Sequence, residues 1–263
     1  MNMHRQTPTP LVEMVGIEKH FGGVRAVDGV SVDLYPGEVV GVLGHNGAGK
    51  SCLMRILSGA MMPSNGEIRV RGERAQIQSP HEAREFGVET IYQTLALADH
   101  LDAPANLFLG RELKTPLGNL DDKRMMKEAR AVLHRLNPNF KNLSDPVSSL
   151  SGGQRQVIAI ARAIYFNVNI LIMDEPTAAL GPSETAMVAE LIKKLSAAGI
   201  GIFLVSHDMA DVFELCDRVM VMNKGRNVGS YKIDEVSKDD VLSLIIKGDL
   251  PDGWTPRNGE VAQ

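Results

Sequence analysis

Residues 44–51 (GHNGAGKS) combine three glycines with a lysine and a hydroxyl group. They fit the pattern G-x-x-x-x-G-K-[ST], in which the backbone curls so that successive N–H groups point at phosphate oxygens. The Lys50 ammonium can reach the β- and γ-phosphates of a nucleotide, and the Ser51 hydroxyl can ligate Mg²⁺. An apolar run precedes the glycines and a helical pattern follows them, as such a loop requires. The predicted phosphate-binding residues are Gly44, His45, Asn46, Gly47, Ala48, Gly49, Lys50, Ser51 and Cys52.

Two carboxylates follow the apolar run of the segment ILIMDEP, residues 170–176. The run predicts a buried strand, so Asp174 stands at its carboxyl end, where it can hold Mg²⁺ directly or through a water. Glu175 stands beside it, where a carboxylate can accept a proton from an attacking water. An adjacent acidic pair is by itself more often a solvated loop. The strand before it and the phosphate-binding loop favour a catalytic pair.

Two further polar residues follow short apolar runs. His207 ends the segment FLVSH and is predicted to contact the γ-phosphate, because ligands of open α/β sheets lie at the carboxyl ends of strands. Gln93 ends the segment ETIYQ, and its amide oxygen could ligate Mg²⁺ or orient water. Taken alone, each has a plain alternative: a lone histidine is more often structural, and a lone glutamine is usually a surface residue.

A second glycine-containing segment, LSGGQ at residues 150–154, precedes an amphipathic helical pattern; we call it the signature loop. The apolar stripe of that helix is Val157, Ile160, Ala161 and Ile164. Free N–H groups at a helix start can bind an anion, so this loop could grip a γ-phosphate from the side opposite the first loop. A two-fold dimer would let each chain lend its loop to the other's nucleotide. The residues concerned are Ser151, Gly152, Gly153 and Gln154.

The elements that position these residues follow from hydrophobic periodicity. Residues 24–34 alternate through Ala26, Asp28, Val30, Val32 and Leu34, which predicts a half-buried strand before a turn at residues 36–37. A strand pair with an Asn65-Gly66 turn is expected at residues 64–75, and a hairpin turning at residues 223–226. One helix is expected to bury Met125, Ala129, Val132, Leu133 and Leu136, and another to begin at a Ser183 cap and end at Gly199.

Strands alternating with helices predict an α/β fold with a mostly parallel core sheet covered on both faces. Residues 94–165 read as mainly helical and interrupt this alternation as an inserted subdomain. We therefore expect a flexible tail at residues 1–10, one domain at residues 11–245 and a disordered tail at residues 246–263.

Composition excludes several classes of protein. The chain of 263 residues has a formal net charge of −4, which gives no support for nucleic-acid binding through a broad basic surface. Its two cysteines, Cys52 and Cys216, make neither a disulfide framework nor a metal site, which fits a reducing compartment. No segment approaches the ~20 apolar residues of a membrane span. We therefore expect that a role at a membrane would be that of a peripheral protein.

The motifs GHNGAGKS, Gln93, LSGGQ, ILIMDEP and His207 occur in the order found in ABC-type ATPases, and the sequence resembles that family from residue 11 to about residue 235. The resemblance implies a P-loop NTPase fold with an N-terminal antiparallel β subdomain and an inserted helical subdomain. It also implies ATP and Mg²⁺ as ligands, and it places Phe21 where the family stacks an aromatic ring on adenine.

Within the family, residues 92–112 (YQTLALADHLDAPANLFLGRE) and residues 174–181 (DEPTAALG) most resemble subunits of bacterial ribose- and fructose-type importers. That resemblance implies a homodimer at the cytoplasmic face of the plasma membrane, under an integral membrane permease served by a periplasmic sugar-binding protein. The segment after Gln93 would meet a cytoplasmic helix of the permease. A non-transport ABC ATPase and an exporter subunit are the alternatives.

Two residues depart from the family pattern. Gly181 stands where the family usually has Asp, which removes a carboxylate that would contact the partner chain. Cys52 stands where Ser or Thr is usual, which weakens a contact to the α-phosphate.

Overall fold

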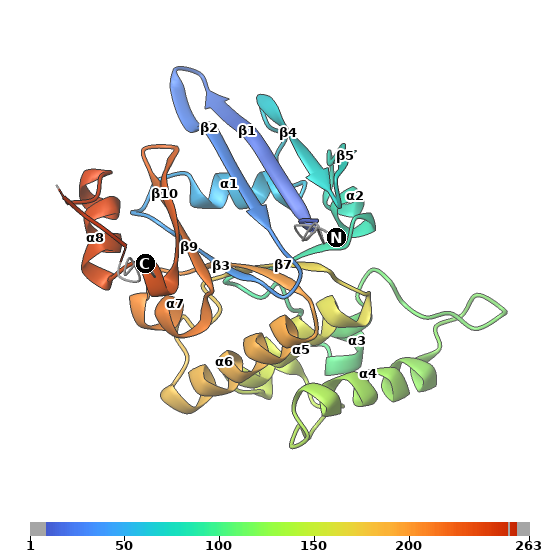
Figure 1. The fold of residues 1–263 in the computed structure, drawn as a ribbon. Helices are drawn as coiled ribbons and strands as arrows, with labels where there is room; N and C mark the ends of the chain where they lie inside the picture. Colours follow the sequence, from blue (N-terminus) through green and yellow to red (C-terminus); the bar gives the residue numbers. More distant parts are fainter. Residues whose placement is uncertain (1–8, 252, 257–263) are drawn as a thin grey trace, which may run out of the picture. The chain divides into compact units, whose positions relative to one another are not determined.

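The computed structural model describes residues 9–251 and 253–256, and the chain forms two compact units (Figure 1). The first unit comprises Met1–Glu89, Asn169–Met173 and Leu195–Gln263, and the second comprises Thr90–Val168 and Asp174–Lys194. The second unit contains the helical insertion expected at residues 94–165 and adds a later segment to it. The expected tail at residues 1–10 falls almost wholly on residues outside the description.

A four-stranded antiparallel sheet in the first unit has the order β2-β1-β4-β5. Its strands are β1 Val12–Phe21, β2 Val24–Leu34, β4 Asn65–Val70 and β5 Glu73–Ala75. In β2 the buried residues are Val27, Val30, Val32 and Leu34, so the alternation expected through Ala26 and Asp28 is shifted by one residue. The register with β1 slips at this point, between the pairs Lys19↔Val27 and Ile17↔Val30.

The turn expected at Asn65-Gly66 is wrong. Both residues belong to β4, where Asn65 pairs with Glu18 of β1, and the chain reverses instead at Arg71-Gly72. These two residues have φ angles of 52° and 83°, which a tight hairpin turn with two left-handed residues requires. Asn-Gly is the stronger local turn signal, but pairing with β1 extends the strand through it.

A six-stranded sheet has the order β10-β9-β3-β8-β7-β6. Its strands are β3 Val39–Leu43, β6 Val88–Ile91, β7 Ile170–Asp174, β8 Gly201–Val205, β9 Arg218–Asn223 and β10 Arg226–Lys232. β3 pairs in parallel with both β8 and β9, and β9 pairs antiparallel with β10 through the predicted hairpin. All five residues of β3 and of β8 are buried, as expected for strands covered on both faces.

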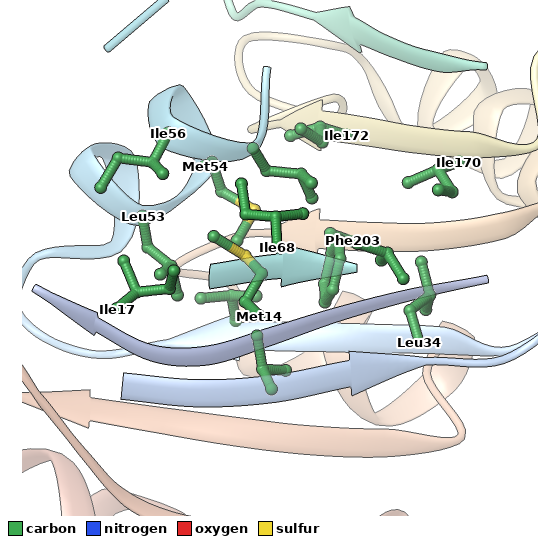
Figure 2. Packing of buried hydrophobic residues seen from close by; sticks show 14 of the residues in the cluster. Met14, Ile17, Leu34, Leu53, Met54, Ile56, Ile68, Ile170, Ile172 and Phe203 are labelled. Carbon is green, nitrogen blue, oxygen red and sulfur yellow. The ribbon is translucent and has the colours of Figure 1, made fainter. Parts of the chain in front are cut away.

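One hydrophobic cluster joins the two sheets of the first unit to α1 (Lys50–Leu57). Leu53, Met54 and Ile56 of α1 meet side chains from both sheets, among them Met14 and Phe203 (Figure 2). Packing on both sides fixes the helix that follows the phosphate-binding loop. The remaining helices of this unit are α2 Pro80–Glu85, α7 Met209–Leu215, α8 Lys238–Lys247 and the 3₁₀ helix η2 Ile233–Glu235.

The last helix of the first unit crosses the domain boundary expected at residue 245. α8 continues to Lys247, where Gly248 ends it with a left-handed φ of 88°. Beyond it, the Trp254 ring packs against Tyr231 with their centroids 5.3 Å apart. Of the tail expected at residues 246–263, residue 252 and residues 257–263 lie outside the described chain.

The second unit is helical. α3 (Ala103–Phe108), α4 (Asp122–Leu136) and α5 (Gly152–Tyr165) pack on one another, and α6 (Pro182–Ala197) starts in this unit. α4 buries its predicted stripe except Val132, which is half-buried. The expected Ser183 cap is wrong, because α6 already starts at Pro182 and the N–H groups of Glu184 and Thr185 bond to the carbonyl of Gly181. Proline suits a first helical position, since its missing N–H would have no partner there.

Candidate functional site

The phosphate-binding loop connects β3 to α1 within the first unit. Gly44 and Gly49 have φ angles of 147° and 104°, a backbone conformation that L side chains rarely adopt. A Cβ at Gly44 would overlap the Met222 carbonyl oxygen, and a Cβ at Gly49 would overlap that of Ala26. Both glycines are therefore required by backbone conformation and by close packing.

Lys50 begins α1 and keeps its ammonium over the loop. Its Nζ donates hydrogen bonds to the carbonyl oxygens of Gly44 at 2.6 Å and His45 at 3.1 Å. A cation above a curled backbone at the start of a helix fits a polyphosphate. The predicted metal ligands, the Ser51 hydroxyl, the Gln93 amide oxygen and the Asp174 carboxylate, are all oxygen donors, which suits Mg²⁺.

Backbone hydrogen bonds join the phosphate-binding loop to the turn between β9 and β10, and that turn to strand β2. Gly225 N–H donates to the Ala48 carbonyl at 3.0 Å, and Asp28 N–H donates to the Gly225 carbonyl at 2.8 Å. The Arg226 guanidinium hydrogen-bonds the Asp28 carboxyl and lowers its pKa. These contacts hold the start of β2 beside the phosphate-binding loop.

Phe21 lies just before this point, at the end of β1. Its side chain is 49% exposed, and the Lys19 ammonium lies 5.3 Å from the ring centre. An exposed ring on the hairpin that leads into Ala26 is free to stack on a flat base.

His207 follows β8, the parallel neighbour of β3. Val205 of β8 pairs with Val42 of β3, so His207 and Gly44 each follow this pair by two residues. The two residues therefore leave the sheet at the same edge, and the His207 side chain is exposed there.

The second unit contains Gln93, Asp174, Glu175 and the signature loop. Asp174 is the last residue of β7, and exposed Gln93 follows β6 by two residues. Glu175 has a left-handed φ of 52°, which is uncommon for a residue with a side chain. Such strained positions cluster at functional sites.

The signature loop forms the first turn of α5. Ser151 caps the helix: its Oγ accepts from the Gln154 N–H at 3.4 Å, and Gln154 Oε1 accepts from the Ser151 N–H at 3.0 Å. Of the predicted stripe, Val157, Ile160 and Ala161 are buried and Ile164 is half-buried. The Gly153 N–H donates to Glu184 Oε1 at 3.1 Å, so an anionic group is already bonded to this turn.

Glu184 is a site residue that the sequence reasoning missed. It is the third residue of α6, and its Oε2 also accepts from the Gly181 N–H at 3.2 Å. A Glu three residues after the residue that caps a helix, here Gly181, is a known capping pattern and was the available signal. Its contact with Gly153 crosses 31 residues of sequence and has no such signal.

A family model described as "ABC transporter" matches residues 27–178, and relatives match along nearly the whole chain. The chain belongs to the ABC transporter family. It is an ATPase of that family, and the phosphate-binding loop at residues 44–52 falls within the matched segment.

Curated relatives are import ATP-binding proteins. The chain is 46% identical over 90% of its length to the fructose import ATP-binding protein FrcA of Rhizobium meliloti, covering 94% of that protein. It is 40% identical over 89% of its length to the xylose/arabinose import ATP-binding protein XylG of Sulfolobus acidocaldarius, covering 93%. A ribose import ATP-binding protein of Caldanaerobacter subterraneus is 39% identical over 92% of the chain, which spans only 48% of that relative.

Solved structures confirm the fold. A nucleotide-free ATP-binding cassette from an ABC transporter superposes with a TM-score of 0.76 at 26% identity, over 85% of this chain and 91% of that one. A cassette in its ADP conformation superposes equally well, at 24% identity over 90% and 94%. The predicted α/β fold with antiparallel and mostly parallel sheets is confirmed. Among the described residues, no helix is both long and apolar enough to cross a membrane.

Proposed function

We propose that the chain binds ATP with Mg²⁺ and that its hydrolysis energises the uptake of a monosaccharide through a membrane permease. The observation that supports a monosaccharide as the transported substrate is the 46% identity to a fructose import ATP-binding protein along 94% of that protein's length. The xylose/arabinose and ribose relatives point to the same class of substrate.

ATP would be bound mainly by the first unit. Phe21 stacks on the adenine, the amides of residues 44–52 bind the phosphates, and Lys50 neutralises the β- and γ-phosphates. Cys52 contributes only its backbone N–H and a weakly polar thiol, where a hydroxyl would bond better. Ser51, Gln93 and Asp174 would hold Mg²⁺, which when bound would neutralise charge on the β- and γ-phosphates.

Hydrolysis would use Glu175 and His207. The water oxygen forms a bond to the γ-phosphorus while the bond from that phosphorus to the β–γ bridging oxygen breaks and leaves ADP. Glu175 accepts the proton that the water loses, and His207 hydrogen-bonds the γ-phosphate. Gln at position 175 keeps the size of the side chain but cannot accept this proton.

A second copy of the chain would complete each site. Ser151, Gly152, Gly153 and Gln154 of one chain would bind the γ-phosphate held by the other chain's phosphate-binding loop. ATP then holds the two copies together, and hydrolysis releases them.

The assembly would work from the cytoplasmic face of the plasma membrane. The segment after Gln93 would contact the permease, and a periplasmic sugar-binding protein would deliver the sugar from the other side. We propose no nucleic-acid partner.

Glu175→Gln, made within the complex, tests the catalytic part. We expect ATP binding to persist, while turnover falls by about 10²–10⁴-fold because the general base is lost. Phosphate release and ATP binding are measured side by side, and the exposed Glu190 of α6, changed to Gln, is the control. Turnover at the parental rate in the Glu175 variant would remove this residue from the mechanism.

The transport part needs the membrane. The chain is isolated from gently solubilised membranes of its source cells, and the proteins bound to it are identified. A sugar permease in the complex, and radiolabelled monosaccharide uptake that stops with Lys50→Ala, are expected. An export pump or a ribosomal or DNA complex in its place would favour the alternatives and overturn import.

A further inference from the structure

Glu184 holds the first turns of two helices together. Its Oε1 accepts from the Gly153 N–H of α5 at 3.1 Å, and its Oε2 accepts from the Gly181 N–H at the start of α6 at 3.2 Å. Hydrogen bonds from the Ser151 side chain, Gly153 and Gly181 lower the pKa of this carboxyl. At neutral pH an anion therefore lies at the turn where the proposed function places a phosphate.

The glycines of the signature loop make this contact possible. A Cβ at Gly153 would lie 2.7 Å from the Met187 methyl carbon and 3.1 Å from the Glu184 Cγ. A Cβ at Gly152 would lie 2.8 Å from a methyl carbon of Leu180. No left-handed φ requires either glycine, so close packing of the loop against α6 and against Leu180, which precedes α6, accounts for them.

The same groups cannot serve two anions at full strength. The Gly153 N–H and the Ser151 hydroxyl are donors that the proposed function assigns to the γ-phosphate of the partner chain. A carboxylate that already bonds both donors satisfies them, and its charge repels a phosphate at hydrogen-bonding distance.

We propose that Glu184 is an internal latch, which occupies the γ-phosphate donors of the signature loop until ATP-driven dimerisation displaces it. This inference rests on the proposed function of the signature loop and names a residue that regulates it.

Displacement of Glu184 from the signature loop would also affect the loop that follows Glu175. Because one carboxylate bonds both Gly153 and Gly181, its movement away from α5 disturbs its bond at the start of α6 as well. Residues 176–181 join Glu175, the proposed general base, to α6. Binding of a phosphate at the signature loop would therefore change the hydrogen bond between Glu184 and Gly181 at the end of this segment.

Glu184→Gln is the informative substitution. Gln serves as well as Glu in a capping pattern, so its single amide oxygen can keep the Gly181 bond and the start of α6. It removes the negative charge that faces Ser151 and Gly153. Glu190→Gln is the matched control, because it removes the same charge from the exposed side of α6.

Dimerisation is measured by sedimentation of chains that also contain Glu175→Gln, with Mg²⁺ and either ATP or ADP, at several protein concentrations. We expect Glu184→Gln to dimerise with ATP at a protein concentration about tenfold lower than the parent. ADP has no γ-phosphate, so its effect should not differ between the two chains. Glu190→Gln should behave as the parent does, and thermal unfolding confirms that all chains are folded.

The outcomes distinguish failure of the proposed site sharing between chains from failure of the Glu184 latch. If the parent forms no dimer with ATP, the proposed sharing of sites between chains fails. If the parent dimerises and Glu184→Gln does so equally or less well, Glu184 is a structural cap and the latch is overturned. If Glu184→Gln also dimerises more strongly than the parent with ADP, the effect is one of general charge and the latch is overturned. The same holds if Glu190→Gln dimerises with ATP as strongly as Glu184→Gln does.

Discussion

The Lys50 ammonium bonds two carbonyl oxygens of the phosphate-binding loop, so it lies over the loop before any nucleotide arrives. Lys50→Ala removes this charge, and we expect ATP affinity to fall by about 10–100-fold, since hydrogen bonds to charged groups contribute about 1.5–3 kcal/mol. Calorimetric titration with ATP measures the loss. Lys123→Ala, at an exposed position of α4, is the control. Equal affinity in the two variants would contradict the assignment of Lys50.

Cys216 is a second residue whose environment has a measurable consequence. It is 7% exposed, and burial, with smaller contributions from the charges of Asp217 and Asp211, raises the pKa of its thiol. The unfolded chain ionises this thiol near its ordinary pKa of about 8.5, so the folded state binds more protons above that pH. Stability should therefore fall as pH rises from about 8.5, by at most about 1.4 kcal/mol per pH unit.

Urea unfolding of the parent and of Cys216→Ala, at pH values from about 7 to 10, tests this reasoning. The parent should lose more stability than the variant over the alkaline part of this range. Buried Leu215 provides the control, because Leu215→Ala changes no titrating group and should keep the parent's slope. Parallel pH curves for the parent and Cys216→Ala would refute the raised pKa.

At the scale of elements, α5 and α6 meet through glycines, and Gly153→Asp should damage this contact and the γ-phosphate site together. The Cβ of the new residue would lie against Met187 and Glu184, and its carboxylate adds a negative charge to the turn that is proposed to bind the phosphate. Gly153→Ala adds the same Cβ without charge. We expect both variants to be less thermostable, and only Gly153→Asp to lose ATP-driven dimerisation completely.

The Gly153→Asp chain should still bind ATP as a monomer, because its phosphate-binding loop belongs to the first unit and Gly153 belongs to the second. Nucleotide titration and sedimentation on the same sample distinguish these effects. A Gly153→Asp chain that dimerises with ATP as the parent does would remove the signature loop from the proposed interface.

The whole molecule is proposed to work as a pair, and mixing two inactive chains tests this directly. In a heterodimer of Gly153→Asp and Lys50→Ala chains, one nucleotide site combines two unchanged halves and the other combines both defects. We expect such mixtures to recover one ATP-occluding site, with hydrolysis if one site suffices. Cross-linked heterodimers that occlude no ATP would count against sharing between chains.

Local chemistry made several elements predictable. Val39–Leu43 and Gly201–Val205 are apolar throughout because both faces of these strands are covered, and such runs can be read without a structure. The hairpin at Lys224-Gly225 follows from Gly225, which accepts its left-handed φ of 82° without strain, while Lys224 adopts 47°.

The errors arose where another interaction, in one case with a distant strand and in the other with adjacent residues, overrode a local signal. Asn65-Gly66 has the sequence of a turn, but β1 pairs with Asn65 and makes it part of a strand. Ser183 has the chemistry of a helix cap, but the helix starts one residue earlier at Pro182. The backbone groups found other partners: β1 pairs with Asn65, and the Gly181 carbonyl accepts from the N–H groups of Glu184 and Thr185.

The sequence by itself determined the family, the phosphate-binding loop and the acidic pair, because these motifs need only residue type and spacing along one strand, loop and helix. Only the tertiary structure decided that Glu184 bonds Gly153, that a Cβ at either signature glycine would meet α6 or the preceding Leu180, and that Glu175 has a left-handed backbone. The physical reason is that hydrogen bonds and close packing act between atoms that are near in space, and folding brings residues 31 positions apart within 3.1 Å.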